Sequence, residues 1–371
     1  MKDTIAAEVL ELAVQIQQIP APTFYEINRA EFIRQKFSEQ GLQDVSIDLL
    51  ANVFARLPGK GNKPPLVLSA HLDTVFPAET DLTVTRSLER IAGPGVGDNS
   101  LGVAGLFGLI WSLTGGINSP AQTGLPGDIW LVANSGEEGL GDLRGMRRVV
   151  DRFQAKVCAY IILEGMALEQ IYHRGLGVQR YRISAHTRGG HSWVDFGCPS
   201  AIHELAALIN RITAIPVPGS PRSSMNIGVI SGGTSVNTIA SEARLELDLR
   251  SESPRVLKRM ISQVEALVKD ANRPGVEVRA EIVGSRPPGK ISENHPLVQL
   301  AVKVLSSLKL ESYLNIGSTD ANIPLSQGLP AICIGLTHGS GAHTMSEAIQ
   351  TSPVELGLRQ LTEIVKGAFD L

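Results

Sequence analysis

The sequence predicts an α/β fold with a second domain inserted into it, and three observations support this prediction. In the first half of the chain, short apolar runs typical of buried strands alternate with helical stretches. From about Gly177 the expected order becomes strand, helix, strand, strand, helix, strand, which is the βαββαβ pattern of a ferredoxin-like domain. After Pro287 and Pro288 the α/β character returns. We therefore expect a main domain built from residues 1–175 and 287–371, with an inserted domain at residues 176–286.

The main domain is expected to contain a sheet that helices cover on both faces. Three apolar runs, LVLSA, IWLVA and VCAYIIL, have the composition of strands inside such a sheet, and they span residues 66–70, 129–133 and 157–163. Helical patterns occupy residues 100–113, 143–153, 297–308 and 353–369, and one further strand is expected at 331–334.

The inserted domain is expected to have four strands and two helices. The strands fall at residues 178–186, 225–230, 243–249 and 276–282, and the helices at 201–212 and 254–271. Four strands need only one layer of helices, so a sheet face or edge is left free for a partner subunit. This pattern favours a homodimer formed through the inserted domain.

The composition is that of a globular protein without a nucleic-acid or membrane partner. Hydrophobic residues make up 43% and charged residues 19% of the 371 residues, a balance that can bury a core. The net charge is only -3 and no basic stripe is present, so no nucleic-acid partner is expected. The longest apolar run, residues 101–113, falls short of the ~20 residues of a membrane span. The N-terminus lacks a signal-peptide pattern and the three scattered cysteines fit reduced thiols, so we expect a cytoplasmic protein.

Polar side chains follow the predicted strands where a metal site could form. His71 and Asp73 end the first strand, and residues two apart on an extended chain share a face. A carboxylate beside an imidazole is the arrangement that orients a metal-ligating histidine. Asp98 precedes the helix at 100–113, which it could simply cap; alternatively it is a carboxylate at the sheet edge where open α/β sheets place their sites.

Further acids and a second histidine follow the other strands. Glu137 and Glu138 lie between glycines, and on an extended backbone their side chains would diverge, so that one could bind metal and the other face a substrate. Glu164 ends another strand, and His343 lies in a glycine-flanked loop. Imidazole and carboxylate ligands without thiolate suit Zn²⁺, Mn²⁺ or Co²⁺. An odd number of ligands with one bridging carboxylate fits two metal ions about 3.5–4 Å apart.

The order of these motifs resembles a known enzyme family. The motifs are H-x-D at 71–73, G-D-N at 97–99, G-E-E-G at 136–139, L-E-G at 163–165 and A-H-T-x-x-E at 342–347. With the inserted ferredoxin-like domain, they resemble the two-zinc metallopeptidase and deacylase family of peptidase T, glutamate carboxypeptidase, acetylornithine deacetylase, succinyl-diaminopimelate desuccinylase and aminoacylase. The resemblance runs from Ile19 to the last helix. It implies a phosphorylase/hydrolase-like zinc-peptidase catalytic domain with an inserted lid/dimerisation domain.

The resemblance also implies a role for each site residue. His71 and Glu164 would bind one metal ion and Glu138 and His343 the other, with Asp98 bridging both, Asp73 orienting His71 and Glu137 acting as general base. The implied reaction is hydrolysis of the amide bond of a small peptide by a water that bridges two zinc ions, with cobalt or manganese as alternatives.

Other residues match the substrate-binding and lid positions of that family. His191, in T-R-G-G-H-S at 187–192, matches a lid histidine that stabilises the oxyanion in its own or the other subunit. Asn237 and Arg250 match positions that hold the substrate's carboxylate or carbonyl, and an arginine is a natural bidentate clamp for a carboxylate. Gly317 and Ser318, in G-S-T-D, match a second glycine-rich substrate loop.

Departures from the family pattern leave the branch open. Asn99 and Ser100 follow Asp98, where peptidase T and glutamate carboxypeptidase usually have a second acid and a lysine. The glutamate at position 164 matches the carboxypeptidase and deacylase branches. By contrast, the opening IPAPT at 19–23 and the HLDTVFP segment at 71–77 resemble the peptidase T-like group. The alternative substrate is therefore an N-acyl amino acid, hydrolysed by the same two-metal chemistry. A non-catalytic metal- or peptide-binding protein is the remote alternative, and the retained Glu137 argues against it because metal binding does not need that residue.

Overall fold

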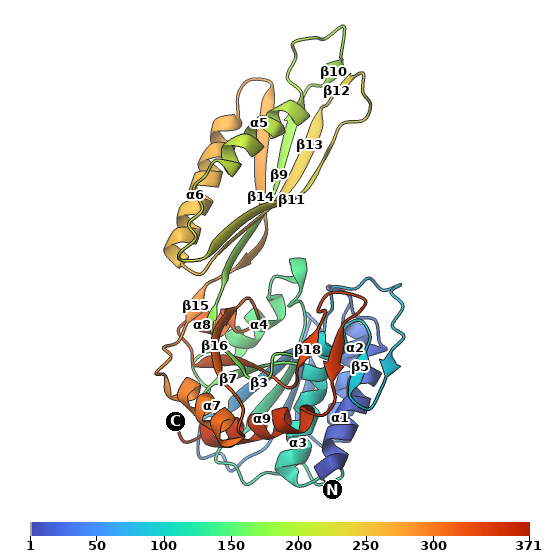
Figure 1. The fold of residues 1–371 in the computed structure, drawn as a ribbon, viewed down its shortest axis with the longest axis vertical. Coiled ribbons are helices and arrows are strands. Elements are labelled where there is room, and N and C mark those ends of the chain that lie inside the picture. Colours follow the sequence, from blue (N-terminus) through green and yellow to red (C-terminus); the bar gives the residue numbers. More distant parts are fainter. Residues whose placement is uncertain (1) are drawn as a thin grey trace. The chain divides into compact units, whose positions relative to one another are not determined.

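The chain forms two compact units in the computed structural model, which describes residues 2–371 and their side chains from residue 5 onward. Unit 1 comprises Met1–Gly175 and Gly289–Leu371, and unit 2 comprises Leu176–Pro288 (Figure 1). Residue 1, where the predicted main domain begins, lies outside the described residues. The fold class predicted from the sequence, an α/β domain interrupted by a ferredoxin-like insertion, is confirmed.

Unit 1 is built on one large sheet whose central strands are parallel. The strand order is β1-β2-β6-β3-β7-β17-β8-β15, and β16 pairs with β8. These strands are β1 Gln43–Ile47, β2 Val53–Leu57, β3 Leu66–His71, β6 Ile129–Asn134, β7 Tyr160–Glu164, β8 Gln170–Gly175, β15 Gly289–Lys290, β16 Tyr313–Gly317 and β17 Ala331–Gly335. β3 runs parallel to β6 and β7, and β17 runs parallel to β7. All residues of β3 and β17 are buried, which is why these strands appear in the sequence as unbroken apolar runs.

Helices pack against this sheet, and one of them lies entirely in the core. They are α1 Lys2–Gln17, α2 Ile27–Glu39, α3 Gly102–Thr114, α4 Arg144–Phe153, α7 Pro296–Ser307, α8 Asn322–Ser326 and α9 Val354–Ala368, with short turns at η1 Val96–Leu101 and η2 Gly139–Gly141. Every residue of α3 from Gly102 to Trp111 is buried. The stretch Val96–Thr114 is long and apolar enough to cross a membrane, but 83% of the tested window is buried inside the protein. It is therefore the core helix of unit 1.

A second, smaller sheet of unit 1 brings two distant segments together. Its order is β18-β19-β5-β4, formed by β4 Thr85–Arg86, β5 Arg90–Ala92, β18 Gly339–Ser340 and β19 Ala348–Gln350. Ala348 of β19 pairs with Ala92 of β5. The loop between β18 and β19, which contains His343, is thereby held beside the segment that leads into η1.

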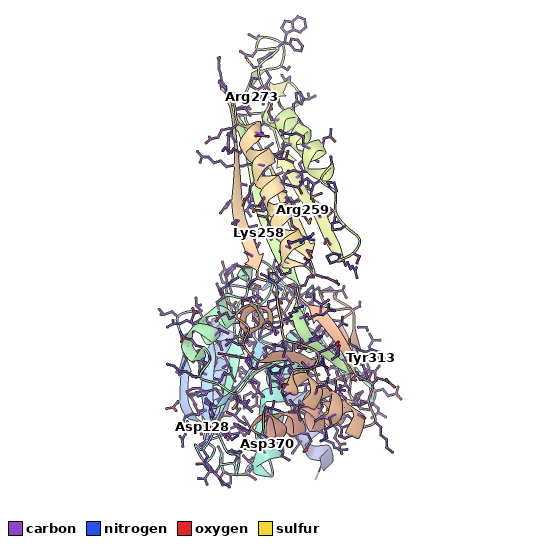
Figure 2. All side chains as sticks on the ribbon, turned by 90° about the vertical axis from the view of Figure 1, so that its left-hand side faces the viewer. Asp128, Lys258, Arg259, Arg273, Tyr313 and Asp370 are labelled. Atoms are coloured by element: carbon purple, nitrogen blue, oxygen red, sulfur yellow. The ribbon has the colours of Figure 1, made fainter. Side chains whose placement is uncertain are left out.

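Unit 2 is an antiparallel sheet covered by two helices. The sheet order is β11-β13-β9-β14, from β9 Gly177–Thr187, β11 Ser223–Gly232, β13 Glu242–Ser251 and β14 Val276–Arg286, with a separate pair β10 Gly190–His191 and β12 Thr238–Ile239. The helices are α5 Ala201–Thr213 and α6 Pro254–Ala271. Leu257, Met260 and Val264 of α6 point into the core, whereas Lys258 and Arg259 are exposed (Figure 2). This period is that of an amphipathic helix.

Candidate active site

Strand ends collect the site residues of unit 1 at one edge of the large sheet. His71 ends β3 and Glu164 ends β7, and His71 is the register partner of Asn134 at the end of β6. Because β3, β6 and β7 are parallel, their carboxyl ends lie at the same edge. Glu137 and Glu138 follow β6 directly, and the backbone of Glu138 is extended, with φ -78° and ψ 146°. The sequence therefore places four candidate residues together through strand direction alone.

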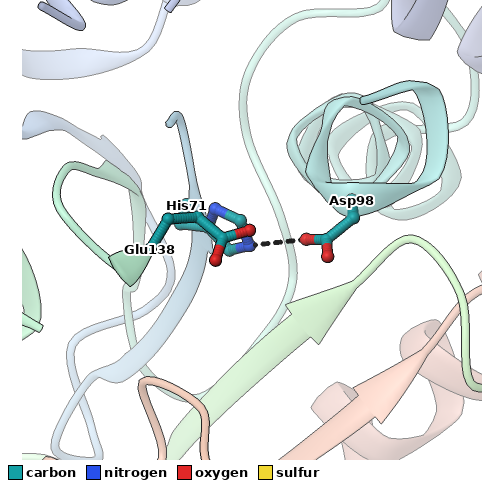
Figure 3. Close-up of side chains that lie close together, drawn as sticks. All are labelled: His71, Asp98 and Glu138. Atoms are coloured by element: carbon teal, nitrogen blue, oxygen red, sulfur yellow. Dashed lines mark ion pairs between the residues drawn. The ribbon is translucent and has the colours of Figure 1, made fainter. Parts of the chain in front are cut away.

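The Asp98 carboxylate lies between two histidines. Its Oδ1 is 3.1 Å from Nε2 of His71 (Figure 3). Its Oδ2 is 3.1 Å from Nε2 of His343. His71 Nε2 is also 3.6 Å from Oε2 of Glu164, and His343 Nε2 is 3.1 Å from Oε1 of Glu138. The structure thus brings together all five predicted metal ligands, in the two predicted groups around Asp98.

The loop that carries Asp98 is fixed from two sides. The buried carboxylate of Glu347 accepts the backbone N–H groups of Gly95, Gly97 and Asp98 at 3.2, 2.7 and 2.8 Å. On the other side, Asn99 donates from Nδ2 to the Leu163 carbonyl, and its Oδ1 accepts from the N–H that follows Glu164. The positions of Asp98 and Glu164 are therefore coupled by backbone hydrogen bonds.

Asp73 connects three segments of the site. Its buried carboxylate accepts hydrogen bonds from Thr23 Oγ1 and from the backbone N–H groups of Glu137 and Glu138, each at 2.9 Å. Toward His71, the backbone oxygen of Asp73 is 3.0 Å from Nδ1, and the carboxylate is 3.6 Å away. The closer contact with the His71 ring thus comes from the main chain, and the carboxylate chiefly holds the two glutamates.

The charges of this cluster stabilise one another. Burial lowers the pKa of His71, but the carboxylates of Asp73, Asp98 and Glu164 outweigh burial and hold it well above its ordinary value. Hydrogen bonds that His343 donates to the carboxylates of Asp98 and Glu138 raise the pKa of His343 to about 10. Burial raises the pKa of Asp98, yet the two histidines outweigh it and hold that pKa well below its ordinary range. Burial raises the pKa of Glu164. The carboxylates of this cluster therefore favour positive charge between them.

The donor set and its spacing fit divalent cations. Two ligands of one tetrahedral ion, each about 2.0–2.1 Å from it, lie about 3.4 Å apart. Each candidate ligand atom lies 3.1–3.6 Å from the next one in space, in the order Glu164, His71, Asp98, His343 and Glu138. Suitable atoms of His71, Asp98 and Glu138 all lie within 4.8 Å of one another. Two ions sharing Asp98 would be ligated on one side by His71 and Glu164 and on the other by Glu138 and His343.

The glycine-rich loop after β16 lies beside this cluster through one buried contact. Gly317 ends β16, and a side chain there would collide with the ring of Tyr172. Three residues further on, Asp320 accepts a hydrogen bond at 2.7 Å from Asn134, the register partner of His71. The loop with Gly317 and Ser318 is therefore tied to the strand end that precedes Glu137.

Unit 2 places its three predicted residues in two groups. β10 pairs with β12, so that His191 is opposite Thr238, next to Asn237, and the Asn237 carbonyl accepts the N–H of Ser192 at 3.0 Å. Nδ1 of His191 accepts backbone N–H groups from Trp193 and Val194 at 3.2 and 3.4 Å. Arg250 lies near the opposite end of β13 and is paired with Asp248 at 2.7 Å. Unit 2 itself therefore joins His191 with Asn237 but not with Arg250.

Several residues that hold the site were not predicted from the sequence. Glu347 was visible only as the last letter of A-H-T-x-x-E, and its acidic position four residues after His343 was the available signal. Thr23 and Asn99 were present in recognised motifs without a role. Nothing in the sequence pattern pointed to the Asn134–Asp320 contact.

This arrangement defines a class of protein, a metal-dependent hydrolase with an imidazole and carboxylate site at the end of a parallel sheet. Comparison with family models extends this result. Residues 52–172 match the Peptidase family M28 model, and residues 174–276 match the Peptidase dimerisation domain model of the M20 peptidases.

Relatives and solved structures agree with these matches. The chain is 21% identical to the YqjE protein of Bacillus subtilis (strain 168), over 94% of both chains. It is 26% identical to a protein named "Probable carboxypeptidase" from Arthroderma otae, over 65% of this chain and 55% of that protein. A tripeptidase from Staphylococcus aureus shares the fold with a TM-score of 0.80, at 23% identity over 99% of both chains. The M20-family dinuclear metal binding peptidase YXEP of Bacillus subtilis superposes with a TM-score of 0.68, at 15% identity over 99% of both chains.

The chain is a metallopeptidase, and separate parts of it match models of the M28 and M20 peptidases. This result confirms the resemblance drawn from the sequence motifs. It also establishes that the protein is an enzyme that uses metal, whereas the roles of the individual site residues remain predictions.

Proposed function

We propose that the protein hydrolyses an amide bond of a small peptide with two divalent metal ions, most simply zinc. The observation that supports this proposal best is the Asp98 carboxylate, whose two oxygens each lie 3.1 Å from a different histidine. Such a bridging position suits two ions that share one ligand. When bound, the ions would polarise the scissile carbonyl and lower the pKa of a water molecule.

Glu137 is proposed to move the proton. Its backbone is held by Asp73, it is buried, and it is not among the five candidate ligands. Glu137 would accept a proton from the attacking water as the new C–O bond forms. It would then deliver that proton to the leaving nitrogen as the C–N bond breaks. The second proton of the water passes from the new carboxylic acid to the amine, so the products are a carboxylate and a protonated amine, and the glutamate returns to its ionised form.

His191 is proposed to donate a hydrogen bond to the oxyanion. Since its Nδ1 accepts backbone N–H groups, the proton of the neutral ring is carried by Nε2. That nitrogen is then a donor suited to a developing negative charge. Mixed dimers that combine His191→Ala and Glu137→Gln chains would tell whether His191 acts in its own chain or across the dimer.

Homodimer formation through unit 2 is part of this proposal. Its support is the match of residues 174–276 to a dimerisation domain and the edge position of β11, whose residues are largely exposed. Sedimentation of the full chain would test it, and a monomer at all concentrations would contradict it.

The proposal is tested by measuring metal content and hydrolysis together. The protein is purified without chelator, loaded with zinc, manganese or cobalt, and assayed on di- and tripeptides and on N-acyl amino acids. Two metal ions per chain with peptide turnover are the expected result. Turnover of N-acyl amino acids alone would move the substrate to the deacylase alternative, and no turnover with any metal would contradict the proposal.

A further inference from the structure

Exposed apolar side chains gather on the segments that Asp73 ties together. The Asp73 carboxylate binds Thr23 and the backbone of Glu137 and Glu138, each at 2.9 Å. Large apolar side chains follow within two residues on each of these segments; they are Phe24, Tyr25, Val75 and Leu140, here called the apolar rim, and they are 51, 73, 40 and 47% exposed. Two residues span at most about 7 Å of chain, so Val75 and Leu140 lie close to Asp73 and Glu138.

The apolar rim is held rigidly in place. Tyr25 donates its backbone N–H to Pro22, and Pro22 forms a bridge with Thr74, which precedes Val75. Leu140 lies in the turn η2, which the N–H of Gly141 closes on the Glu138 carbonyl. These contacts make the exposure of the rim a fixed property of unit 1.

Phe24 is the residue of the apolar rim with the most unusual backbone conformation. Its φ is 79°, in the left-handed region that a phenylalanine rarely adopts. The Arg144 guanidinium covers its ring at 4.5 Å from the centroid, and Arg144 is itself paired with the buried Glu26 at 3.0 Å. A strained residue whose exposed ring is supported from beneath suggests a surface that meets a ligand.

The charges around the apolar rim are already paired. Arg144 is bound to Glu26, and Arg147 is bound to Asp142 at 3.3 Å. In the described segments 22–27, 73–77 and 136–144, the remaining charged groups are the site acids Asp73, Glu137 and Glu138. Within these three segments the rim therefore offers apolar area and no unpaired cation, so an apolar substrate side chain fits it better than an acidic one.

We propose that the enzyme prefers substrates with a bulky apolar side chain next to the scissile amide, and that the apolar rim contacts this side chain. This inference rests on the proposed function. The side chains flanking a bound amide begin two bonds from its carbonyl carbon or its nitrogen, so they must lie within a few ångströms of Glu137 and Glu138. The rim is an apolar surface whose segments are tied to these two residues through the Asp73 hydrogen bonds. Burying a leucine or phenylalanine side chain there removes apolar area from water on both partners.

The test compares leucine with glycine at each position of a peptide. The full chain, loaded with metal, is assayed on Gly-Gly-Gly, Leu-Gly-Gly, Gly-Leu-Gly and Gly-Gly-Leu. We expect kcat/KM for one leucine peptide to exceed that of Gly-Gly-Gly by about tenfold or more, as for binding in a hydrophobic pocket. Leu140→Ser and Tyr25→Ser should each lower this ratio several-fold.

Two matched control variants lie outside the rim. Leu88, in the turn between β4 and β5, is 97% exposed, and Tyr313, at the start of β16, is 51% exposed (Figure 2). Leu88→Ser and Tyr313→Ser should keep the leucine-to-glycine ratio. Thermal unfolding of all four variants checks that each is folded.

Three other results would overturn the inference, and they can be told apart. Equal turnover of leucine and glycine peptides, or rim variants that keep the ratio of the unaltered protein, would refute the rim while leaving the hydrolase intact. Rim variants that dissociate an oligomer without changing the ratio would assign the rim to a subunit contact. No hydrolysis of any peptide by the unaltered protein would refute the proposed function itself.

Discussion

One oxygen of the Glu347 carboxylate accepts the backbone N–H of Asp98 at 2.8 Å, across 249 residues of sequence. The same oxygen accepts the N–H of Gly97, and the second oxygen accepts that of Gly95. Glu347 therefore joins the loop of His343 to the loop of Asp98, and it fixes the distance between two candidate ligands without being one itself.

Replacing Glu347 should weaken metal binding. Glu347→Ala leaves three buried N–H groups without an acceptor, and loss of such an outer hydrogen bond typically lowers metal affinity about 10–100-fold. Glu347→Gln keeps one acceptor oxygen and should show a smaller loss. Competition with a chelator of known affinity measures the effect. Glu363→Ala, at an exposed position of α9, is the control, and an affinity of Glu347→Ala equal to that of this control would contradict the role.

The neighbouring glutamates 137 and 138 should separate catalysis from metal binding. Glu137→Gln is expected to lower kcat by about 10²–10⁴-fold while the metal content stays at that of the unaltered protein. Glu138→Gln should lose metal as well, because Glu138 Oε1 lies beside His343. Metal analysis and steady-state kinetics on the two variants provide the comparison. Full activity of Glu137→Gln would show that another group moves the proton.

Removal of the metal should cost both activity and stability. Without metal ions, the Asp98 carboxylate has the two histidines as its ion-pair partners among the described residues. A ligand that binds only the folded state stabilises it by about 2.7 kcal/mol when present at 100 times its Kd. Chelator-treated protein should therefore unfold at a lower temperature, and reloading should restore both the unfolding temperature and turnover. Equal unfolding temperatures for chelator-treated and metal-loaded protein would argue against ions in this cluster.

Asp320 should make the stability of the metal-free protein depend on pH. Burial raises the pKa of this carboxyl from 3.8 to about 7, since it is fully buried beside Asn134. Below about pH 4 the group is protonated in both states. Between pH 4 and 7 the unfolded chain releases its proton and the folded chain keeps it, so stability falls as pH rises through this window.

Asp320→Asn cannot titrate and therefore isolates this contribution. The free energy of unfolding of the variant, relative to that of the unaltered protein, should increase from pH 4 to pH 7. Denaturant unfolding at several pH values measures it. A constant difference between the two proteins would show that Asp320 is ionised in the folded state throughout.

Much of the fold could be predicted because its central elements have strong local patterns. β3 and most of α3 are buried and appear as largely apolar runs, and α6 has a clear helical period with Ser253 as its N-cap. β1 and β16 were not foreseen, because they are short and partly exposed and carry polar residues. Strand order was not predictable either, since β17 inserts between β7 and β8 from far along the chain.

Some residues of the candidate site could likewise be predicted from local sequence patterns, and others could not. His71 and Glu164 could be placed together because each directly follows a buried strand, and parallel strands end at one edge. Glu347 and Asp320 could not, because each acts through a partner that is 180 or more residues away. A lone acid in a loop has no periodicity, and only the folded chain shows which backbone it faces.

The chain leaves unit 1 and returns to it at neighbouring positions of one sheet. Gly175 of β8 and Gly289 of β15 are register partners in an antiparallel pair, whose Cα atoms lie about 4.5–5.5 Å apart. β8 and β15 pair as the two strands of a hairpin do, and the segment that connects them is the whole of unit 2. The length, surface and partners of that insertion can therefore change in evolution without shifting the register of the strands that carry the metal site.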